Sequence, residues 1–331
     1  RSLRLVYSCY AEVSKCLAYN LKINNLNHMR KIVQGIVTPL VTPLIDNNTL
    51  DIAGLERLIE HVISGGVHGI FILGTTGEAS NLAINLRIEM IRQSSRLIRK
   101  RVPLLVGISD TSITESIRLA ETAASFSADA VVSTPPFYFV MDQTELAEYY
   151  ESLVPQLNLP LYLYNMPVNT KISFDPKTIK RIAENPRVVG FKDSSGNAPY
   201  LQRVIHEMRN CENFSIFVGP EEMTAEMVLL GADGGVNGGA NIFPRLYVDL
   251  YHAAVANDIE VVRNLQAKIM NISSTLYTVG ENGSSYLKGL KCSLEILGIC
   301  NGFIASPFKK FSGQQYGQVK TALEKIMRIC E

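Results

Sequence analysis

The sequence predicts an α/β fold, a (β/α)8 TIM barrel with a C-terminal helical extension. From residue 31 onward, short β-branched runs that end in turn residues alternate with segments of helical period, which is the pattern of repeated β and α units. Eight such runs precede residue 240. Each unit is about 30 residues long, as a strand, a helix and two loops require. Eight parallel strands, each followed by a helix, make up a closed barrel.

The expected strands are bounded by Gly, Pro, Ser, Thr or Asn. They cover residues 33–39, 67–73, 103–108, 128–134, 160–165, 188–192, 214–219 and 231–237. Two of the helical segments between them, 51–66 and 112–126, place their apolar residues on one face. A doubly wound open sheet is the alternative fold. It would normally carry a G-x-G-x-x-G turn after the first strand, and "GIVTPLVTP" contains no such turn.

The chain divides into three predicted parts. Residues 1–28 mix basic and apolar residues without a continuous hydrophobic stretch or a clear cleavage site. We therefore expect a leader or a disordered segment there, which need not be native, rather than a secretory signal. Residues 29–243 are expected to form the (β/α)8 barrel. Residues 244–331 form a helical region, with helices expected at 245–256, 258–278, 284–298 and 313–329.

The composition is that of an ordinary globular protein, with 47% hydrophobic residues, 19% charged residues and a formal net charge of +1. No basic stripe indicates nucleic-acid binding, and no run approaches the ~18 apolar residues of a membrane span. The six cysteines form neither a C-x-x-C pair nor a Cys/His ligand spacing. We therefore expect no metal site, no disulfide framework and a reducing cytoplasm.

Lys192 lies at the end of the sixth expected strand, in "RVVGFKDSSG", and such barrels carry their chemistry at the C-terminal ends of the strands. Alternation puts Gly190 and Lys192 on one face and Val189, Phe191 and Asp193 on the other. If the aromatic ring packs against the outer helices, the lysine points into the barrel. Desolvation there favours a neutral amine, which can attack a ketone. The alternative is a lysine that reaches solvent where the strand ends.

Thr75 and Thr76 follow the second expected strand, between Gly74 and Gly77. Two hydroxyls with adjacent backbone N–H groups in a tight turn suit a small anion such as a carboxylate. The alternative is a helix N-cap with Glu78 in the first turn. Both can hold together, because the donors at a helix start are themselves an anion site.

Two tyrosines stand at neighbouring strand ends. Tyr138 follows Pro135 and Pro136, which stiffen the chain and end the hydrogen-bond ladder, so we expect its phenol to be held at the rim. Tyr164 closes the next strand. Either phenol could transfer a proton, or could pack at the rim with its hydroxyl satisfied. We rank Tyr138 above Tyr164 as the acid–base group.

Five motifs occur in order on successive strand ends: "GTTGEASN", "TPPFYF", "YNMPVNT", "GFKDSSG" and "GADGGVNGGANIFP". Together they resemble the pyruvate-dependent class I aldolase family that contains dihydrodipicolinate synthase and N-acetylneuraminate lyase. The resemblance covers residues 31–325. It implies the same barrel fold and a homotetramer, because the family usually assembles as dimers of dimers.

The resemblance also implies the chemistry. Lys192 stands where the family keeps the lysine that forms a Schiff base with pyruvate, and Tyr138 where it keeps a proton-relaying tyrosine. Thr75 and Thr76 match the pair that holds the pyruvate carboxylate, and we count Thr76 among the catalytic residues. The imine would act as an electron sink, so that the neighbouring carbon becomes an enamine nucleophile. Neither a metal nor an organic cofactor is needed.

Further substrate contacts are expected from Tyr164 and Ser194, and from Asn237 and Gly238, which follow the strand whose backbone lines the same pocket. The "KDSSG" motif resembles the form found in hydroxy-oxoglutarate and keto-deoxy sugar acid aldolases more than the K-E-A form of the synthases.

Departures from the family pattern bear on the aldehyde partner. Dihydrodipicolinate synthases bind the second carboxylate with an arginine where this chain has Asn169, which offers no charged bidentate clamp. The lyases hold sugar hydroxyls with two acidic residues, and "GPEE" supplies Glu221 and Glu222. These carboxylates could instead stabilise the first turn of the next helix. Gly238 stands where the lyases have a serine.

We therefore expect reversible cleavage of a 2-oxo-3-deoxy sugar acid or a 4-hydroxy-2-oxo acid into pyruvate and an aldehyde, as in N-acetylneuraminate lyase. The first alternative is 4-hydroxy-tetrahydrodipicolinate synthase, which condenses pyruvate with aspartate semialdehyde. The second is a barrel that binds pyruvate or a sugar acid without turnover. A complete set of Lys192, Tyr138, Thr75 and Thr76 favours catalysis, because a binding module needs no amine aimed at a ketone.

Overall fold

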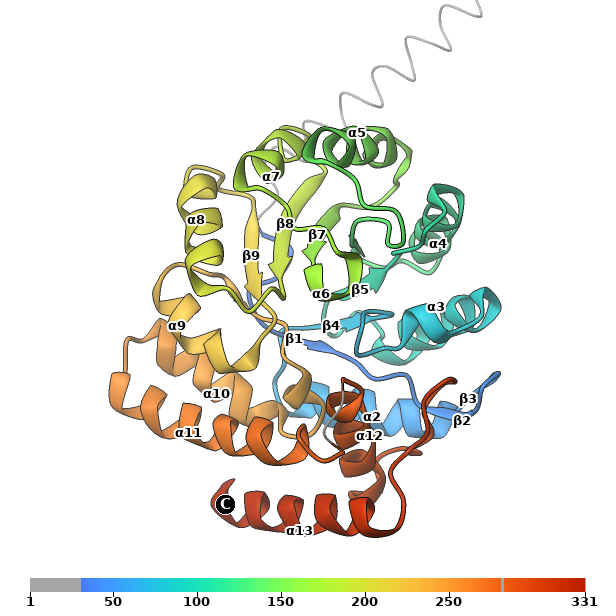
Figure 1. Cartoon of the computed structure of the whole chain (residues 1–331), viewed down its shortest axis with the longest axis vertical. Coiled ribbons are helices and arrows are strands. Elements are labelled where there is room, and N and C mark those ends of the chain that lie inside the picture. The colour runs from blue at the N-terminus through green and yellow to red at the C-terminus, as the bar shows by residue number, and fades with distance from the viewer. Residues whose placement is uncertain (1–30, 281–282, 331) are drawn as a thin grey trace, which may run out of the picture.

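A computed structural model describes residues 31–280 and 283–330, so the predicted leader lies outside the described residues. Eight parallel strands close into a barrel in the order β1-β10-β9-β8-β7-β6-β5-β4, which confirms the predicted fold class (Figure 1). The strands are β1 (Gly35–Pro39), β4 (Gly69–Ile72), β5 (Leu104–Gly107), β6 (Ala130–Ser133), β7 (Leu161–Asn165), β8 (Val188–Asp193), β9 (Ser215–Val218) and β10 (Gly234–Gly235).

Helices surround the barrel on its outside (Figure 1). They are α2 (Ile52–Ser64), α3 (Ile84–Ile98), α4 (Ile113–Ser125), α5 (Gln143–Leu153), α7 (Pro176–Ile182), α8 (Ala198–Met208), α9 (Thr224–Leu229) and α10 (Pro244–Val255). Several of these helices begin at a residue whose side chain caps the free backbone N–H groups of the first turn. Asp142 and Glu145 form a capping box at α5, and the Asn197 side chain accepts from the backbone N–H of Tyr200 at α8.

The C-terminal region continues with α11 (Ile259–Leu276), α12 (Ser285–Ile296) and α13 (Gly313–Cys330). Helix α10 contacts β1 and α9, which is the place of the eighth barrel helix. A division after residue 243 separates α10 from the strands that it covers, so we propose that the helical region begins after α10. Helices α11 and α13 lie side by side, and α12 contacts both of them (Figure 1).

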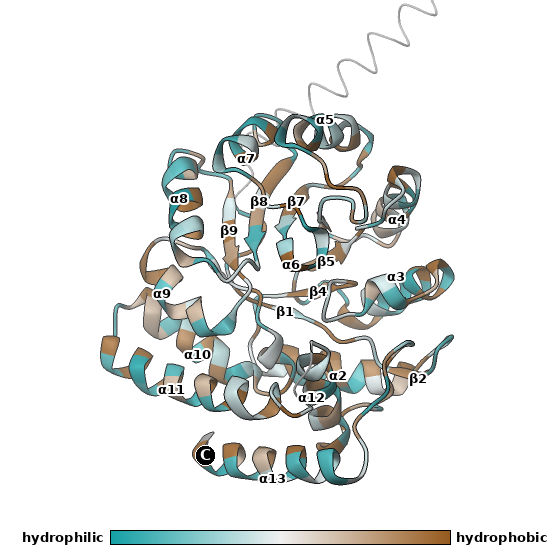
Figure 2. Ribbon diagram, viewed as in Figure 1, coloured by the Kyte–Doolittle hydropathy of each residue, from teal (hydrophilic) through white to brown (hydrophobic). Residues whose placement is uncertain are grey.

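The apolar core has two layers. The inner layer fills the barrel and includes Phe71, Tyr162, Tyr164 and Phe217, and the outer layer lies between the strands and the helices. Phe191 belongs to the outer layer, as predicted, and packs edge-on against the Phe174 ring. In Figure 2, β8 is hydrophobic at its start and hydrophilic at its arrowhead. The strand therefore carries its polar residues to the C-terminal end of the barrel.

Two details differ from the prediction. Val189 lies in the inner layer, because the register of β7 against β8 shifts between Leu161 and Tyr162 and Val189 is the extra residue there. A hairpin of β2 (Leu44–Asp46) and β3 (Thr49–Leu50) follows β1. It is too short to show a strand period in the sequence, and the Asp46 carboxylate fixes its turn by accepting from the backbone N–H of Asn48.

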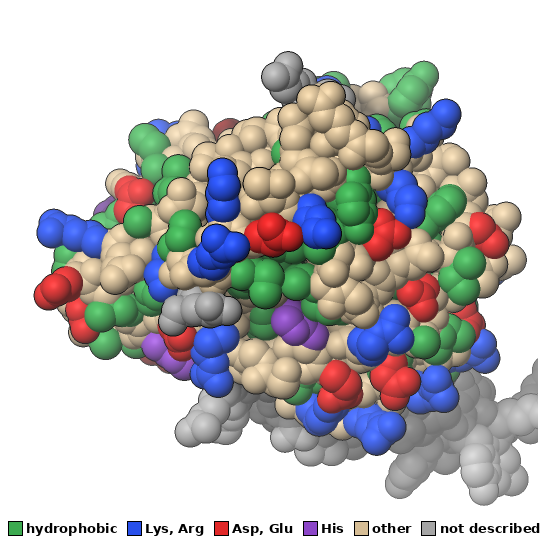
Figure 3. Space-filling model, turned by 90° about the horizontal axis from the view of Figure 1, so that it is seen from below, with side chains coloured by type: hydrophobic (Ala, Val, Ile, Leu, Met, Phe, Trp, Pro, Cys, Tyr) green, Lys and Arg blue, Asp and Glu red, His purple; other side chains and the backbone are tan. Residues whose placement is uncertain are grey.

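The surface has no single charge character on the face shown in Figure 3. There, Lys and Arg side chains are interspersed with Asp and Glu side chains among hydrophobic groups. Across residues 31–280 and 283–330, no helix combines the length and hydrophobicity that crossing a membrane requires.

Candidate active site

Lys192 is the centre of the candidate site. It lies on β8 with 7% of its surface exposed, and its Nζ atom is 4.1 Å from the centroid of the Tyr164 ring and 5.3 Å from that of Phe71. Both rings belong to the barrel interior. The side chain therefore points into the barrel, as the alternation along β8 predicts, and not outward to bulk solvent. Within the described part of the chain, its ammonium forms no ion pair.

Tyr164 is the phenol that the structure places beside this amine. It stands opposite Lys192 in the β7–β8 register, and its hydroxyl is 3.2 Å from the Thr75 hydroxyl. Burial alone would raise the pKa of Tyr164. The positive charge of Lys192 and the hydroxyls of Thr75 and Ser194 outweigh this effect, so its pKa lies below the ordinary value. A phenol with a lowered pKa beside an amine is suited to moving protons.

Tyr138 lies in the segment that follows β6 and the two prolines. Its side chain is 86% exposed, its ring contacts that of Phe139 edge-on, and its φ of 108° is rare for a residue with a side chain. Strand β6 ends at Ser133, before the two prolines, and Phe139 and Val140 are exposed together with Tyr138. The ranking of Tyr138 above Tyr164 as the acid–base group stays a prediction.

The turn after β4 brings Thr75 and Thr76 to the same end of the barrel. Gly77 is required here, because a Cβ atom would lie 2.9 Å from the backbone nitrogen of Leu73. Thr76 is buried and its hydroxyl is 3.1 Å from that of Tyr286, whereas Thr75 is exposed and contacts Tyr164. The threonine in contact with the acid–base candidate is thus Thr75, not Thr76.

Glu78 is not the first-turn residue of an N-capped helix. Its backbone is left-handed, with φ of 60°, and the short helix η1 (Ala79–Asn81) starts after it. The carboxylate is buried and pairs with Lys291, and it accepts from the backbone N–H of Ala305 at 2.8 Å. The turn is therefore anchored to the C-terminal region rather than capped by its own residues.

Glu221 and Glu222 differ in burial. Helix η3 (Glu221–Met223) begins at the first of them, so the two side chains point in different directions and Glu222 is exposed. Glu221 is buried and accepts from the hydroxyls of Tyr247 at 2.6 Å and Tyr277 at 2.9 Å, and from the backbone N–H of Gly239 at 2.9 Å. Burial raises its pKa to about 7. A carboxyl group enclosed in this way is not presented to a sugar hydroxyl.

The remaining predicted residues differ in exposure. Asn237 is buried and its amide donates to the Gly219 carbonyl and the Thr224 hydroxyl, so it ties β9 to β10. Ser194 is partly buried next to Tyr164. Asn169, in the short helix α6 (Pro167–Thr170), is exposed. Gly238 begins helix η4 (Gly238–Asn241) and faces Tyr286.

Sequence reasoning missed the residues that reach the site from α12. Tyr286 and Lys291 contact Thr76 and Glu78, which are over 200 positions earlier in the chain. A helical pattern alone contains no signal for such a contact, because it identifies a buried face but not the group that the face meets.

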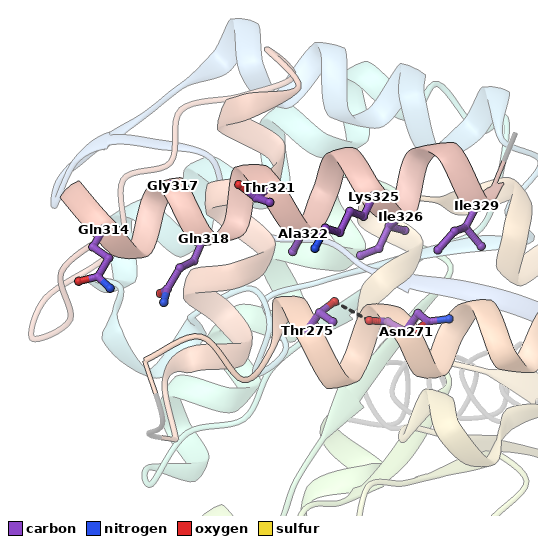
Figure 4. A pocket seen from close by; sticks show the side chains of 10 residues that line it. All are labelled: Asn271, Thr275, Gln314, Gly317, Gln318, Thr321, Ala322, Lys325, Ile326 and Ile329. Carbon is purple, nitrogen blue, oxygen red and sulfur yellow. Dashed lines mark hydrogen bonds between the residues drawn. The ribbon is translucent and has the colours of Figure 1, made fainter.

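A cavity of about 620 Å³ lies between α11 and α13 and contains none of the predicted site residues (Figure 4). It is lined by Asn271, Thr275, Gln314, Gly317, Gln318, Thr321, Ala322, Lys325, Ile326 and Ile329. Its lining is mixed, with Lys325 as the one charged side chain among these residues.

Over the described residues, no group of three or more His, Cys, Asp or Glu side chains is arranged to hold a metal ion.

Comparisons with known proteins identify the family of this chain. The model of the dihydrodipicolinate synthetase family matches residues 32–326. The 4-hydroxy-tetrahydrodipicolinate synthase of Cellvibrio japonicus is 28% identical over 293 residues, which are 88% of this chain and 99% of that protein. A probable 2-dehydro-3-deoxy-D-pentonate aldolase of Escherichia coli is 29% identical over 271 residues, 81% of this chain and 89% of that protein.

A solved structure is more similar still. Dihydrodipicolinate synthase from Bacteroides thetaiotaomicron is 59% identical and superimposes with a TM-score of 0.88, over 90% of this chain and 100% of that chain. The family match covers most of the chain, and the fold and motif order agree with it. The chain belongs to the dihydrodipicolinate synthetase family and is a pyruvate-dependent class I aldolase.

Proposed function

We propose that Lys192 forms an imine with pyruvate and that Tyr164 moves the protons. The observation that carries this proposal is the buried amine of Lys192, 4.1 Å from the Tyr164 ring centroid, with the Tyr164 hydroxyl in contact with Thr75. The neutral amine attacks the keto carbon, a proton moves from the nitrogen to the former keto oxygen, and the resulting carbinolamine loses its hydroxyl as water. Tyr164 supplies the proton that the departing hydroxyl needs, and Thr75 links it to the pyruvate-binding turn.

The carbon–carbon step follows from the imine. In the direction of cleavage, the hydroxyl on the carbon beyond the enamine position gives its proton to the Tyr164 phenolate and becomes the aldehyde carbonyl. The bond between that carbon and its neighbour breaks, and its electron pair moves into the iminium, which becomes an enamine. Protonation of the enamine and hydrolysis of the imine then release pyruvate and restore Lys192. The reverse sequence condenses pyruvate with an aldehyde.

For the substrate, we propose a 2-oxo-3-deoxy sugar acid or a 4-hydroxy-2-oxo acid. Asn169 is exposed and uncharged at the place where a second carboxylate would need a cation. The E. coli relative supports this proposal, because its name, probable 2-dehydro-3-deoxy-D-pentonate aldolase, gives a 2-oxo-3-deoxy sugar acid as the substrate. The enclosure of Glu221 removes one of the two carboxylates expected to hold a sialic acid chain, so the proposal does not extend to that sugar.

A second candidate is 4-hydroxy-tetrahydrodipicolinate synthase. It is favoured by the Bacteroides thetaiotaomicron structure, which carries the name dihydrodipicolinate synthase at 59% identity. The two candidates share the imine at Lys192 and differ only in the carbonyl partner. The same active site can therefore be tested for both with one enzyme preparation.

The experiment compares kcat/KM for cleavage of a panel of 2-oxo-3-deoxy sugar acids and 4-hydroxy-2-oxo acids, read as pyruvate released, with that for condensation of pyruvate and aspartate semialdehyde. We expect cleavage of at least one panel member to be the more efficient reaction. We also expect Asn169→Arg to raise the condensation rate. Wild-type protein that prefers aspartate semialdehyde over the whole panel would overturn the proposed substrate class and establish the second candidate.

Two further expectations remain proposals. We propose a homotetramer, built as a dimer of dimers. We also propose a cytoplasmic location, which is consistent with the free state of Cys211, Cys292 and Cys300 among the described cysteines.

A further inference from the structure

Helix α12 lies against the pyruvate-binding turn at two points. The Tyr286 hydroxyl is 3.1 Å from the Thr76 hydroxyl, and the Lys291 ammonium pairs with the Glu78 carboxylate. Both members of the ion pair are fully buried, and the ammonium also donates to the Phe303 carbonyl at 2.6 Å. The ion pair fixes the position of α12 relative to the turn, so Tyr286 meets Thr76 in a defined geometry.

Gly238 provides the space that Tyr286 occupies. A Cβ atom at this position would lie 1.7 Å from the Tyr286 hydroxyl oxygen and 2.6 Å from the ring carbon that carries it. The Tyr286 ring cannot move aside freely, because it packs edge-on against Tyr277 at a centroid distance of 4.8 Å. The phenol therefore fills the place that any side chain at position 238 would take.

The geometry points to Tyr286 as a positioning residue for pyruvate, acting through Thr76. This inference rests on the proposed function, in which the Thr75–Thr76 turn binds the pyruvate carboxylate. Thr76 has a single hydroxyl proton. When Tyr286 donates its own proton to the Thr76 oxygen, the Thr76 proton is left to point toward the carboxylate, which accepts hydrogen bonds but donates none.

Tyr286 is suited to this direction of donation. Burial raises its pKa, so the phenol keeps its proton throughout the neutral range. A chain of two hydroxyls that ends on an anion is fully satisfied only when each hydroxyl donates toward the anion, and each bond then strengthens the next. Pyruvate binding thus selects one orientation of both hydroxyls.

The test measures the pyruvate concentration that half-saturates imine formation, by borohydride trapping, in wild type, Tyr286→Phe, Thr76→Val and the double variant. Tyr286→Phe keeps the ring and removes one hydrogen bond, so we expect half-saturation to rise roughly three- to tenfold. In the Thr76→Val background, Tyr286→Phe should leave the half-saturating pyruvate concentration unchanged, because the Tyr286 hydroxyl has already lost its partner. Tyr251→Phe, a partly buried tyrosine on α10, is the matched control and should behave as wild type.

Unchanged half-saturation in Tyr286→Phe, or equal effects in both backgrounds, would overturn the inference while leaving the proposed function intact. A variant that changes KM for the aldehyde but not half-saturation by pyruvate would also overturn it, because Tyr286 would then contact the second substrate. If wild-type protein forms no imine with pyruvate at any concentration, the proposed function fails and this inference fails with it.

Discussion

Tyr164 combines the properties that a proton-transferring group beside an imine needs. It is buried, it faces the amine of Lys192, and its hydroxyl contacts Thr75. The charge of the amine and the neighbouring hydroxyls lower its pKa against the effect of burial. The phenolate that forms during proton transfer is therefore less costly here than in an apolar pocket.

Replacing Tyr164 with phenylalanine should slow the reaction without removing the pyruvate site. We expect the rate constant of imine formation at saturating pyruvate to fall by about 10²- to 10⁴-fold, the usual contribution of a general acid–base group. Tyr251→Phe, at a partly buried tyrosine of the outer layer on α10, is the matched control and should stay within about twofold of wild type. Borohydride added at a series of times after mixing with pyruvate gives the rate constant of imine formation for each variant. A larger loss in Tyr138→Phe than in Tyr164→Phe would show that Tyr138, and not Tyr164, is the acid–base group.

Glu221 should make stability depend on pH. Burial raises its pKa from 4.5 to about 7, while Tyr247 and Tyr277, whose pKa values are also raised, stay protonated. The stabilisation that Glu221 contributes is therefore fully present below its ordinary pKa of 4.5, and it is lost as pH rises through about 7. Relative to Glu221→Gln, the free energy of unfolding of wild type should fall by about 2 to 3 kcal/mol between acid and neutral conditions.

Urea unfolding of both proteins at pH 5 and pH 8 gives this difference. The comparison with Glu221→Gln cancels the titration of the other groups, which the two proteins share. A difference that stays constant between the two pH values would show that Glu221 is ionised in the folded protein throughout.

At the scale of elements, the turn after β4 and helix α12 depend on each other. The Glu78–Lys291 pair joins them with both side chains fully buried, and Glu78 also holds the backbone N–H of Ala305. A buried ion pair adds little net stability over apolar residues, but the loss of one partner leaves the other charge without compensation. The pair therefore specifies the arrangement more than it strengthens the fold.

Lys291→Met should cost about 3 to 5 kcal/mol in the free energy of urea unfolding, because it leaves the Glu78 carboxylate buried alone. The double variant Glu78→Gln, Lys291→Met should recover part of this loss. Lys180→Met is the matched control, because the Lys180–Glu207 pair is exposed. It should cost less than about 1 kcal/mol. Equal losses for Lys291→Met and Lys180→Met would contradict this account of the pair.

For the whole molecule, the sequence predicted the architecture better than the site. Strand periods and turn residues give eight units and therefore a closed barrel, and alternation along β8 gives the inward direction of Lys192. The positions of Tyr138 and Glu221 depend on where the chain turns after a strand, and the contacts of Tyr286 depend on how distant elements pack. Local patterns contain neither kind of information.

Three consecutive residues after β6 are unusually exposed for their type. Tyr138, Phe139 and Val140 have 86%, 80% and 67% of their surfaces exposed. A second copy that covers them would remove this apolar surface from water, in agreement with the proposed homotetramer. Phe139→Asp should therefore shift the protein to smaller species in sedimentation velocity, whereas Val255→Asp, at an exposed position at the end of α10, should not. Wild-type protein that sediments as a monomer would contradict the proposed assembly.

The proposed mechanism requires a covalent bond between the amine of Lys192 and pyruvate. To test for this bond, the protein is mixed with pyruvate and reduced with borohydride, and the added mass is located by peptide mass spectrometry. We expect an adduct on Lys192, and none in Lys192→Arg, which keeps the charge but cannot form the imine. No adduct in wild type, or an adduct on another lysine such as Lys288 or Lys291, would contradict it and would favour a barrel that binds its ligand without this chemistry.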